Sequence, residues 1–309
     1  MLASLLTALF FAISVVFASR SARVFGGAIA NLGRMIVALV LLALWAHLFG
    51  GGLRGASLGW FILSGVVGFG FGDIALFLSL TRLGPRLTAL LAQCLAAPFG
   101  ALFEYIWLGT VVHVPQLLCG GIVLLGVALA IAPEKGATLP TKSGGSRIHW
   151  TGVLFGALAA LGQAGGAVLS RKAYAVAHLH SVVIDGGTAA YQRMLGGILT
   201  AGIFYGAVYL LKGLNVVKGP PAVAQRPQRE RAGGWIWILL HAATGPTLGV
   251  GCYQWALSST PSGIVLPIVA TTPVLTVPFA YLINHDKPTV RSLIGGVIAV
   301  AGTILLMKL

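Results

Sequence analysis

Four ionisable side chains lie inside long runs of apolar residues, and their chemistry is the clearest in the chain: Arg34, Asp73, Glu104 and Arg193. In lipid each such group costs at least about 2.5–3.5 kcal/mol, so it needs a charged partner or a water-filled cavity. The two carboxylates could take up and release protons, and the two arginines could attract an anionic group. The alternative is structural: an ion pair, such as Arg34 with Asp73 or Glu104, that ties two helices together.

Prolines and neutral polar side chains in the same runs offer further binding groups. Pro98 and Pro273 are expected to interrupt helices and so expose backbone carbonyls to a ligand or cation. Gln93 and the pair Thr271-Thr272 lie beside these prolines and offer amide and hydroxyl groups. Packing kinks at the prolines are the alternative interpretation. The remaining candidates for substrate binding or ion coupling are Gln163, Tyr191, His241, Tyr253 and Gln254.

The segment Gly70-Phe71-Gly72-Asp73 matches the Gly-x-Gly-Asp pattern of intramembrane aspartyl proteases. That chemistry requires a second aspartate, because two carboxylates must share a proton to activate water. No other aspartate lies within an apolar run, and the chain contains no Tyr-Asp, no Pro-Ala-Leu and no HExxH. We therefore expect no enzyme activity, no metal site and no cofactor.

The composition excludes a water-soluble fold. Apolar residues make up 57 % of the 309 residues, charged residues make up only 8 %, and the mean hydropathy is +0.94. A soluble domain carries about 25 % charged residues because its surface must be solvated. Disorder and a secreted disulfide scaffold are excluded on the same grounds. The net charge of +14 does not indicate nucleic-acid binding, since no basic run is interleaved with aromatic residues.

Ten apolar runs are long enough to cross a bilayer as helices, which takes roughly 20 residues. Continuous runs, as opposed to alternating segments of about ten residues, exclude a β-barrel. The fold class is therefore an all-α membrane protein with ten transmembrane helices. Their expected limits are 2–18, 30–49, 58–80, 87–109, 114–132, 150–169, 189–211, 234–257, 262–283 and 290–307.

Matched motifs divide the ten expected spans into two copies of five. Because each copy crosses the membrane an odd number of times, the second is inverted relative to the first, an architecture that leads directly to alternating access. We expect a first repeat at 1–133, a connecting loop at 134–149 and a second repeat at 150–309. The motif pairs recur after 159, 175 and 175 positions: Arg34-Met35 and Arg193-Met194, Pro98 and Pro273, and Gly120-Gly121 and Gly295-Gly296.

Basic residues predict the orientation. The loops after odd-numbered spans contain fourteen Lys and Arg, whereas the opposite side contains four, namely Arg54, Arg171, Lys172 and Lys308. Basic residues gather on the cytoplasmic side. We therefore expect the odd-numbered loops in the cytoplasm and both termini outside.

The pattern resembles the drug/metabolite transporter superfamily, in particular its EamA-type members with ten spans and two repeats. The resemblance is carried by Arg34 and Arg193 near the starts of the second and seventh spans, and by the proline-centred stretches 89–109 and 265–284. Where the family often has Leu-Gly-Glu after the fourth span, this chain has Leu108-Gly109-Thr110, and its second copy has His285-Asp286. The resemblance implies export or exchange of small metabolites, amino acids or drugs. It also implies a cavity lined by spans one, three, four, six, eight and nine.

The sequence therefore predicts a multi-pass transporter of the inner membrane, most simply an exporter, that works by alternating access. The chain contains no nucleotide-binding motif, so a gradient must drive it, and Asp73 or Glu104 would couple protons. The expected partners are a small-molecule substrate, the lipid bilayer and protons; nucleic acid is excluded, and a homodimer is left open. A channel-like facilitator is the alternative, and an intramembrane aspartyl protease is the weaker one.

Overall fold

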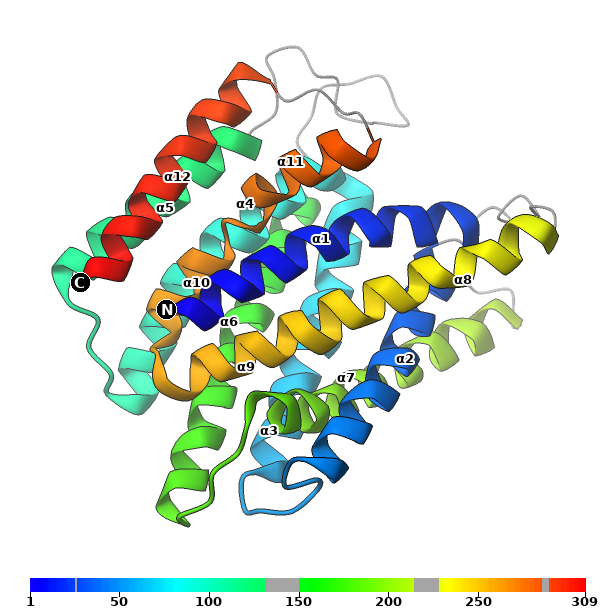
Figure 1. Ribbon diagram of the computed structural model, residues 1–309, viewed down its shortest axis with the longest axis horizontal. Helices are drawn as coiled ribbons and strands as arrows, with labels where there is room; N and C mark the ends of the chain where they lie inside the picture. Colours follow the sequence, from blue (N-terminus) through cyan, green and yellow to red (C-terminus); the bar gives the residue numbers. More distant parts are fainter. Residues whose placement is uncertain (26, 132–149, 214–227, 285–288) are drawn as a thin grey trace.

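The computed structural model describes residues 1–25, 27–131, 150–213, 228–284 and 289–309, and every regular element in these residues is a helix (Figure 1). The expected connecting loop at 134–149 and the pair His285-Asp286 lie outside the described residues. In chain order the elements are α1 (Leu2–Phe25), α2 (Gly27–Leu48), α3 (Leu58–Gly65), the π-helix η1 (Val66–Gly72), α4 (Asp73–Leu108), α5 (Val114–Ile131), α6 (Trp150–Leu179), α7 (Gly186–Gly213), α8 (Gln228–Ala242), the π-helix η2 (Ala243–Gly249), α9 (Val250–Ser259), α10 (Ser262–Val269), α11 (Thr272–Asn284) and α12 (Val290–Lys308).

Most of these helices are long and apolar enough to cross a membrane. Large apolar side chains on the outside, such as Leu118 and Val297, are exposed as expected for helices surrounded by lipid. The other two long helical runs, α7 and α8–η2–α9, carry polar residues such as Gln192 and Gln254 along their length. Among the described residues, eight helical segments are long and apolar enough to cross a membrane: Leu2–Phe25, Ile29–Leu48, Leu58–Leu83, Leu87–Leu108, Val114–Ile131, Trp150–Leu179, Ser262–Phe279 and Val290–Lys308.

Local capping residues explain where several helices begin and end. Asp185 precedes α7 and accepts hydrogen bonds from the backbone N–H groups of Gly187 and Thr188. Thr289 precedes α12, and its hydroxyl accepts a hydrogen bond from the Ser292 N–H. Gly109 ends α4 with φ of 65°, a left-handed conformation that glycine adopts without strain. These ends satisfy backbone groups that a helix leaves without partners.

Helix α4 reverses direction within its length. The hydroxyls of Ser79 and Thr88 lie 3.1 Å apart, although nine positions separate them. In a straight helix nine residues span about 13.5 Å, so the chain must turn back between them. Gly84 and Pro85 lie in this interval of the sequence. The element therefore supplies two separate spans, as the sequence predicts for 58–80 and 87–109.

Glycines bring the two π-helices close to neighbouring helices. A Cβ added to Gly162 would lie 2.6 Å from the Gly72 Cα, and a Cβ added to Gly166 would lie 3.0 Å from the Gly68 Cα. Helix α6 and η1 thus meet backbone to backbone, as small residues allow in membrane proteins. On the other π-helix, Gly249 faces the ring of Phe11 in α1.

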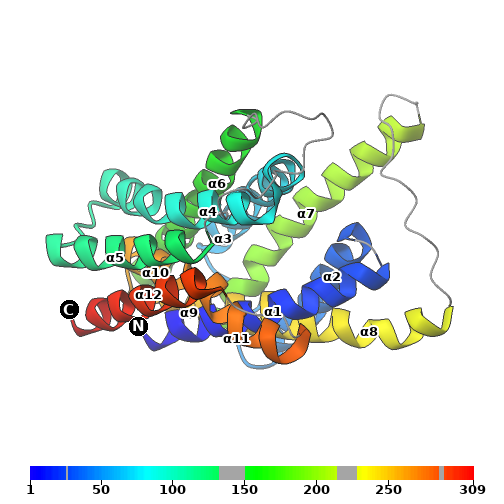
Figure 2. The same ribbon diagram turned by 90° about the horizontal axis from the view of Figure 1, so that it is seen from above.

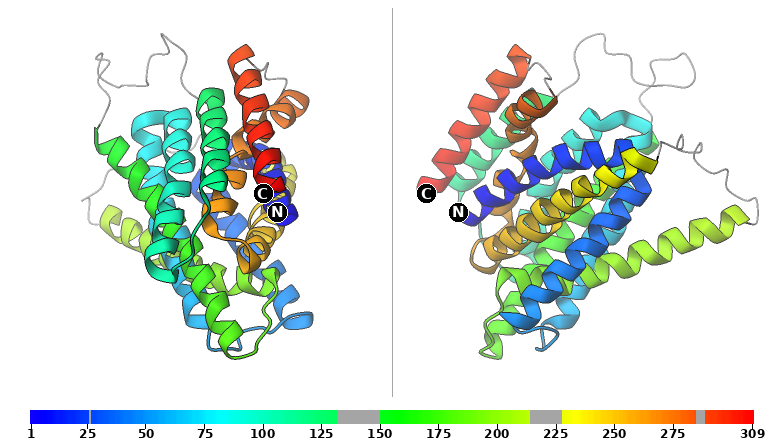
Figure 3. Two further views of the ribbon diagram at one scale, coloured as in Figure 1. Left: turned by 90° about the vertical axis from the view of Figure 1, so that its left-hand side faces the viewer. Right: turned by 45° about the vertical axis from the view of Figure 1, so that its right-hand side comes forward.

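The same packing arrangement occurs twice in the molecule. Helix α6 packs along α3, η1 and α4, and α1 packs along α8, η2 and α9. Helices α5 and α12 lie side by side in Figures 2 and 3. Their contact is reciprocal, because a Cβ on Gly126 would lie 2.7 Å from the Gly295 oxygen, and one on Gly295 would lie 2.6 Å from the Gly126 oxygen.

Some predicted limits are wrong. Helix α6 continues to Leu179, ten residues beyond the expected end at 169, so Arg171 and Lys172 lie in a helix instead of a loop. Helix α4 continues through Pro98, where a break was expected. The ninth span does break, but at Ala270-Thr271, directly before α11. Pro98 occupies an exposed position of this continuous helix.

Candidate functional site

Arg193 of α7 lies at the centre of a buried polar cluster. Only 4 % of it is exposed. Its guanidinium carbon is 4.9 Å from the centre of the Phe69 ring and 5.6 Å from that of Tyr253. Gly68 makes room for it, because a Cβ at that position would lie 2.4 Å from an Arg193 nitrogen. Aromatic faces attract such a cation.

Hydroxyl and amide groups from three further helices complete this Arg193 cluster. Arg193 Nη1 donates to the Ser170 Oγ at 3.4 Å, and Gln254 Nε2 donates to the same oxygen at 3.1 Å. The Ser64 hydroxyl lies 2.8 Å from the Ser170 hydroxyl and donates to the Gly166 oxygen. We define the Arg193 cluster as Ser64, Ser170, Arg193, Tyr253 and Gln254.

Several buried polar atoms around the cluster have no hydrogen-bond partner among the described residues. They are Arg193 Nε, Gln254 Oε1 and the Tyr174 hydroxyl. An unsatisfied buried donor or acceptor costs about 1–3 kcal/mol. A polar solute or water that reached these atoms would recover that free energy.

Asp73 faces the same interior. It is partly exposed, begins α4 directly after η1, and interacts electrostatically with Arg34 and Arg193. Arg34 in turn donates to Asn31 Oδ1 at 2.8 Å and interacts electrostatically with His241. The structure thus brings together four of the residues singled out in the sequence, from α2, α4, α7 and α8.

Glu104 lies in a separate network at an end of the bundle. Arg171 Nε donates to Glu104 Oε1 at 2.9 Å, and Arg171 Nη1 donates to the Leu257 oxygen at 2.8 Å. The Ser262 N–H and hydroxyl both donate to Glu104 Oε2. We call Glu104, Arg171, Leu257 and Ser262 the Glu104 network. It joins α4, α6 and α9 to the first residue of α10.

The partner that the structure gives Glu104 differs from the one suggested by the sequence. The pairing with Arg34 is replaced by an ion pair with Arg171, a residue that the sequence placed in a loop. The longer α6 is the reason, because it carries Arg171 into the bundle beside α4. The Glu104 carboxylate, 1 % exposed, therefore has donors on both oxygens.

The other predicted site residues are dispersed. Tyr191 is buried and packs edge-on against His47, with ring centres 5.5 Å apart. The Thr271 and Thr272 hydroxyls donate to Ile268 and Val269 oxygens at the helix break. Gln93, Pro273 and Gln163 are partly exposed. The amide oxygen of Gln163 is buried and has no hydrogen-bond partner among the described residues.

Sequence reasoning missed Ser64, Ser170 and Arg171. The serines carry no signal that distinguishes them from the small polar residues common in membrane helices. Arg171 could have been found only from the true length of α6, because the helix must extend past residue 169 to bring Arg171 beside α4.

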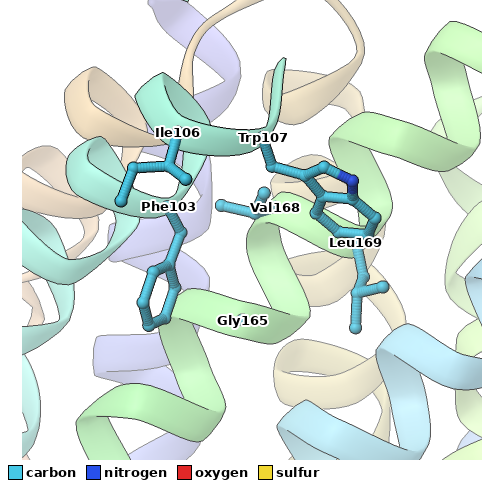
Figure 4. A pocket seen from close by; sticks show the side chains of 6 residues that line it. All are labelled: Phe103, Ile106, Trp107, Gly165, Val168 and Leu169. Atoms are coloured by element: carbon cyan, nitrogen blue, oxygen red, sulfur yellow. The ribbon is translucent and has the colours of Figure 1, made fainter. Parts of the chain in front are cut away.

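Three cavities lie outside the Arg193 cluster. An apolar one of about 260 Å³ is lined by Phe103, Trp107 and Val168, among others (Figure 4). A polar one of about 360 Å³ lies beside Arg171, with His178 and Ser259 in its wall. The third lies between α2, the connection before α7, and η2–α9. Among the residues that the structure describes, no group of three or more His, Cys, Asp or Glu could hold a metal ion.

Comparisons with known proteins place the chain in a family. The model of the EamA-like transporter family matches residues 1–132 and 150–308. No curated protein matches the chain. One solved protein crystal structure superposes with a TM-score of 0.73 at 16 % sequence identity, over 99 % of this chain and 96 % of that one. At this identity the likeness concerns the fold alone.

Proposed function

The chain belongs to the EamA-like transporter family, within the drug/metabolite transporter superfamily, and we propose that it is a secondary transporter that moves a small solute by alternating access. The family membership makes it a multi-pass membrane protein and suggests transport of small substrates. Ten spans in two inverted repeats, export as the direction, and the inner membrane as the location are parts of the proposal.

The repeated packing supports an inverted repeat. The π-helix η2 begins 177 positions after η1, close to the 175 that separates Pro98 from Pro273. Both π-helices contain glycines four positions apart, at Gly68 and Gly72 and at Gly245 and Gly249. In this proposal the ten spans are the eight apolar segments together with α7 and the continuous run α8–η2–α9.

The observation that carries the function is the Arg193 cluster. It is built from α3, α6, α7 and α9, which belong to both proposed repeats, and its unsatisfied polar atoms lie deep in the molecule. A site shared by two repeats is where rocking of one repeat against the other would change access. We assign solute binding to this cluster.

The Glu104 network would close one end of the carrier. It joins α4, α9 and α10, near their ends at Leu108, Ser259 and Ser262, to Arg171 in α6. Opening that end would separate Glu104 from Arg171 and Ser262. Because both Glu104 oxygens have donors, we assign proton coupling to Asp73, which is partly exposed and interacts electrostatically with Arg34 and Arg193.

Counterflow in proteoliposomes tests the transport function. Vesicles are loaded with single amino acids, sugars, nucleobases or cationic drugs, and uptake of the labelled compound is measured. We expect saturable counterflow for at least one class, and its loss in Arg193→Gln but not in Arg54→Gln, which changes an exposed arginine between α2 and α3. Flux without counterflow would indicate a channel, and no flux for any class would contradict the proposal.

The same vesicles test the role of Asp73. In the wild-type protein the rate of uptake should change with pH, and in Asp73→Asn this dependence should disappear, because the amide does not titrate. A pH dependence that survives in Asp73→Asn would remove the coupling role from this residue.

A further inference from the structure

A third cavity, of about 860 Å³, lies away from the Arg193 cluster, between α2, the connection before α7, and η2–α9. None of the five residues of the Arg193 cluster lines it. Its wall is mostly apolar, with two indole rings, one carboxylate and one thiol. The residues that matter here are Leu42, Trp45, Asp185, Leu248, Cys252 and Trp255.

The cavity opens toward the outside of the helix bundle. Trp45 is 50 % exposed and Trp255 is 51 % exposed, and they come from α2 and α9, respectively. Leu248 of η2 is also exposed. The two tryptophans lie within about one helical turn of the ends of α2 and α9, so the mouth of the cavity is near the ends of these helices.

Asp185 gives the cavity its charge. It accepts hydrogen bonds from the indole of Trp45 at 2.8 Å, from two backbone N–H groups, and from the Thr188 hydroxyl. Burial alone would raise the pKa of Asp185, but the hydrogen bonds from Thr188, Trp45 and Gly187 lower it below its ordinary value. The carboxylate is therefore ionised at neutral pH. The bond to Trp45 also fixes the indole beside it.

The chemistry of the wall selects one class of ligand. An apolar cavity of this size suits a drug-sized molecule, since ligand pockets are usually about 300–1,000 Å³. The carboxylate repels anions, and indole faces attract cations, most strongly where water is excluded. A metal ion would require several oxygen ligands, whereas one carboxylate lines this wall.

We propose that this cavity is a binding site for a lipophilic organic cation, with its charge toward Asp185 and its apolar groups against Leu42, Leu248 and the indoles of Trp45 and Trp255. The site goes beyond the proposed transport function and does not depend on it.

Cys252 supplies a direct measurement of occupancy. It is a free, partly exposed thiol in the wall of the cavity. In the Cys94→Ala/Cys119→Ala background the described chain retains this single cysteine. The protein is reconstituted in lipid nanodiscs, and the rate of Cys252 labelling by a membrane-soluble maleimide is measured with and without tetraphenylphosphonium. We expect the cation to slow labelling in a saturable manner.

Tetraphenylborate is the matched control, because it has nearly the same shape and the opposite charge. Weaker protection by tetraphenylborate, by about tenfold in concentration or more, supports the proposal. Equal protection by both ions would show an apolar cavity without charge selection, and no protection by either would show that the cavity is not a site. Either result overturns the proposal.

Two variants locate the charge and the aromatic contact. Asp185→Asn removes the negative charge, so the affinity for tetraphenylphosphonium should fall by about tenfold or more. The variant should still fold, because asparagine caps a helix about as well as aspartate does. Trp255→Ala should also weaken protection, whereas Trp150→Ala, an exposed tryptophan at the start of α6, should not. Undiminished protection in both Asp185→Asn and Trp255→Ala would contradict the proposal. Trp255→Ala remains informative if Asp185→Asn does not fold.

Discussion

At the level of single residues, Glu104 and Arg171 illustrate how buried charge is accommodated. Glu104 is 1 % exposed and Arg171 is 19 % exposed, and each also bonds to the backbone of α9 or α10. A buried pair adds little net stability, because desolvation offsets its attraction, but removing one partner leaves an uncompensated charge.

We therefore expect Arg171→Met to destabilise the protein more than the double variant Glu104→Gln/Arg171→Met. The single change leaves a buried carboxylate and should cost about 3–5 kcal/mol, whereas the double change leaves no charge. Unfolding in detergent, followed by helical circular dichroism, measures both. If the losses of unfolding free energy in Glu104→Gln and Arg171→Met sum to the loss in the double variant, the two residues are not coupled.

At the level of helices, contacts between glycines determine how closely η1 and α6 approach. Gly162 faces the backbone of Gly72, and a Cβ at Gly162 would lie only 2.6 Å from the Gly72 Cα. The π-helices themselves are wider turns that often mark functional positions. Close contact at η1 places Gly68 so that the Arg193 guanidinium fits beside it.

Gly162→Ala is expected to destabilise the protein by about 1–3 kcal/mol, as overpacking does. Its Cβ would lie 2.6 Å from the Gly72 Cα and 2.9 Å from the Gly72 nitrogen, and backbone cannot rotate away. Gly202→Ala is the matched control, because no atom lies within 4 Å of a Cβ added there and alanine favours a helix. Thermal unfolding in detergent compares the two variants, and an equal melting temperature would contradict the close contact.

At the level of the whole molecule, both termini lie at the same end of the α5–α12 pair (Figure 1). Residues 131 and 150, which flank the segment outside the described residues, are the end of α5 and the start of α6. Five crossings before this connection and five after it would place the connection and the C-terminus on opposite faces of the membrane.

Reporter fusions test this topology. A reporter active only in the cytoplasm should be active when fused after residue 140 and inactive when fused after Leu309, and a periplasmic reporter should give the reverse. We expect this orientation because the odd-numbered loops contain most of the basic residues. The same reporter active at both positions would rule out five crossings in the second half.

The amino-acid sequence alone was enough to predict that this protein lies in a lipid bilayer, and to predict most of its helices. The reason is that a run of about twenty apolar residues is a local property of the chain, and such a run is long enough to cross a bilayer as a helix. The sequence also indicated Arg34, Asp73 and Arg193, since isolated charges in such runs are conspicuous. Only the tertiary structure decided which groups meet. Arg171 and Glu104 are 67 positions apart, and Glu104 and Ser262 are 158 apart. Such contacts depend on helix lengths and glycine packing, and no single segment contains that information.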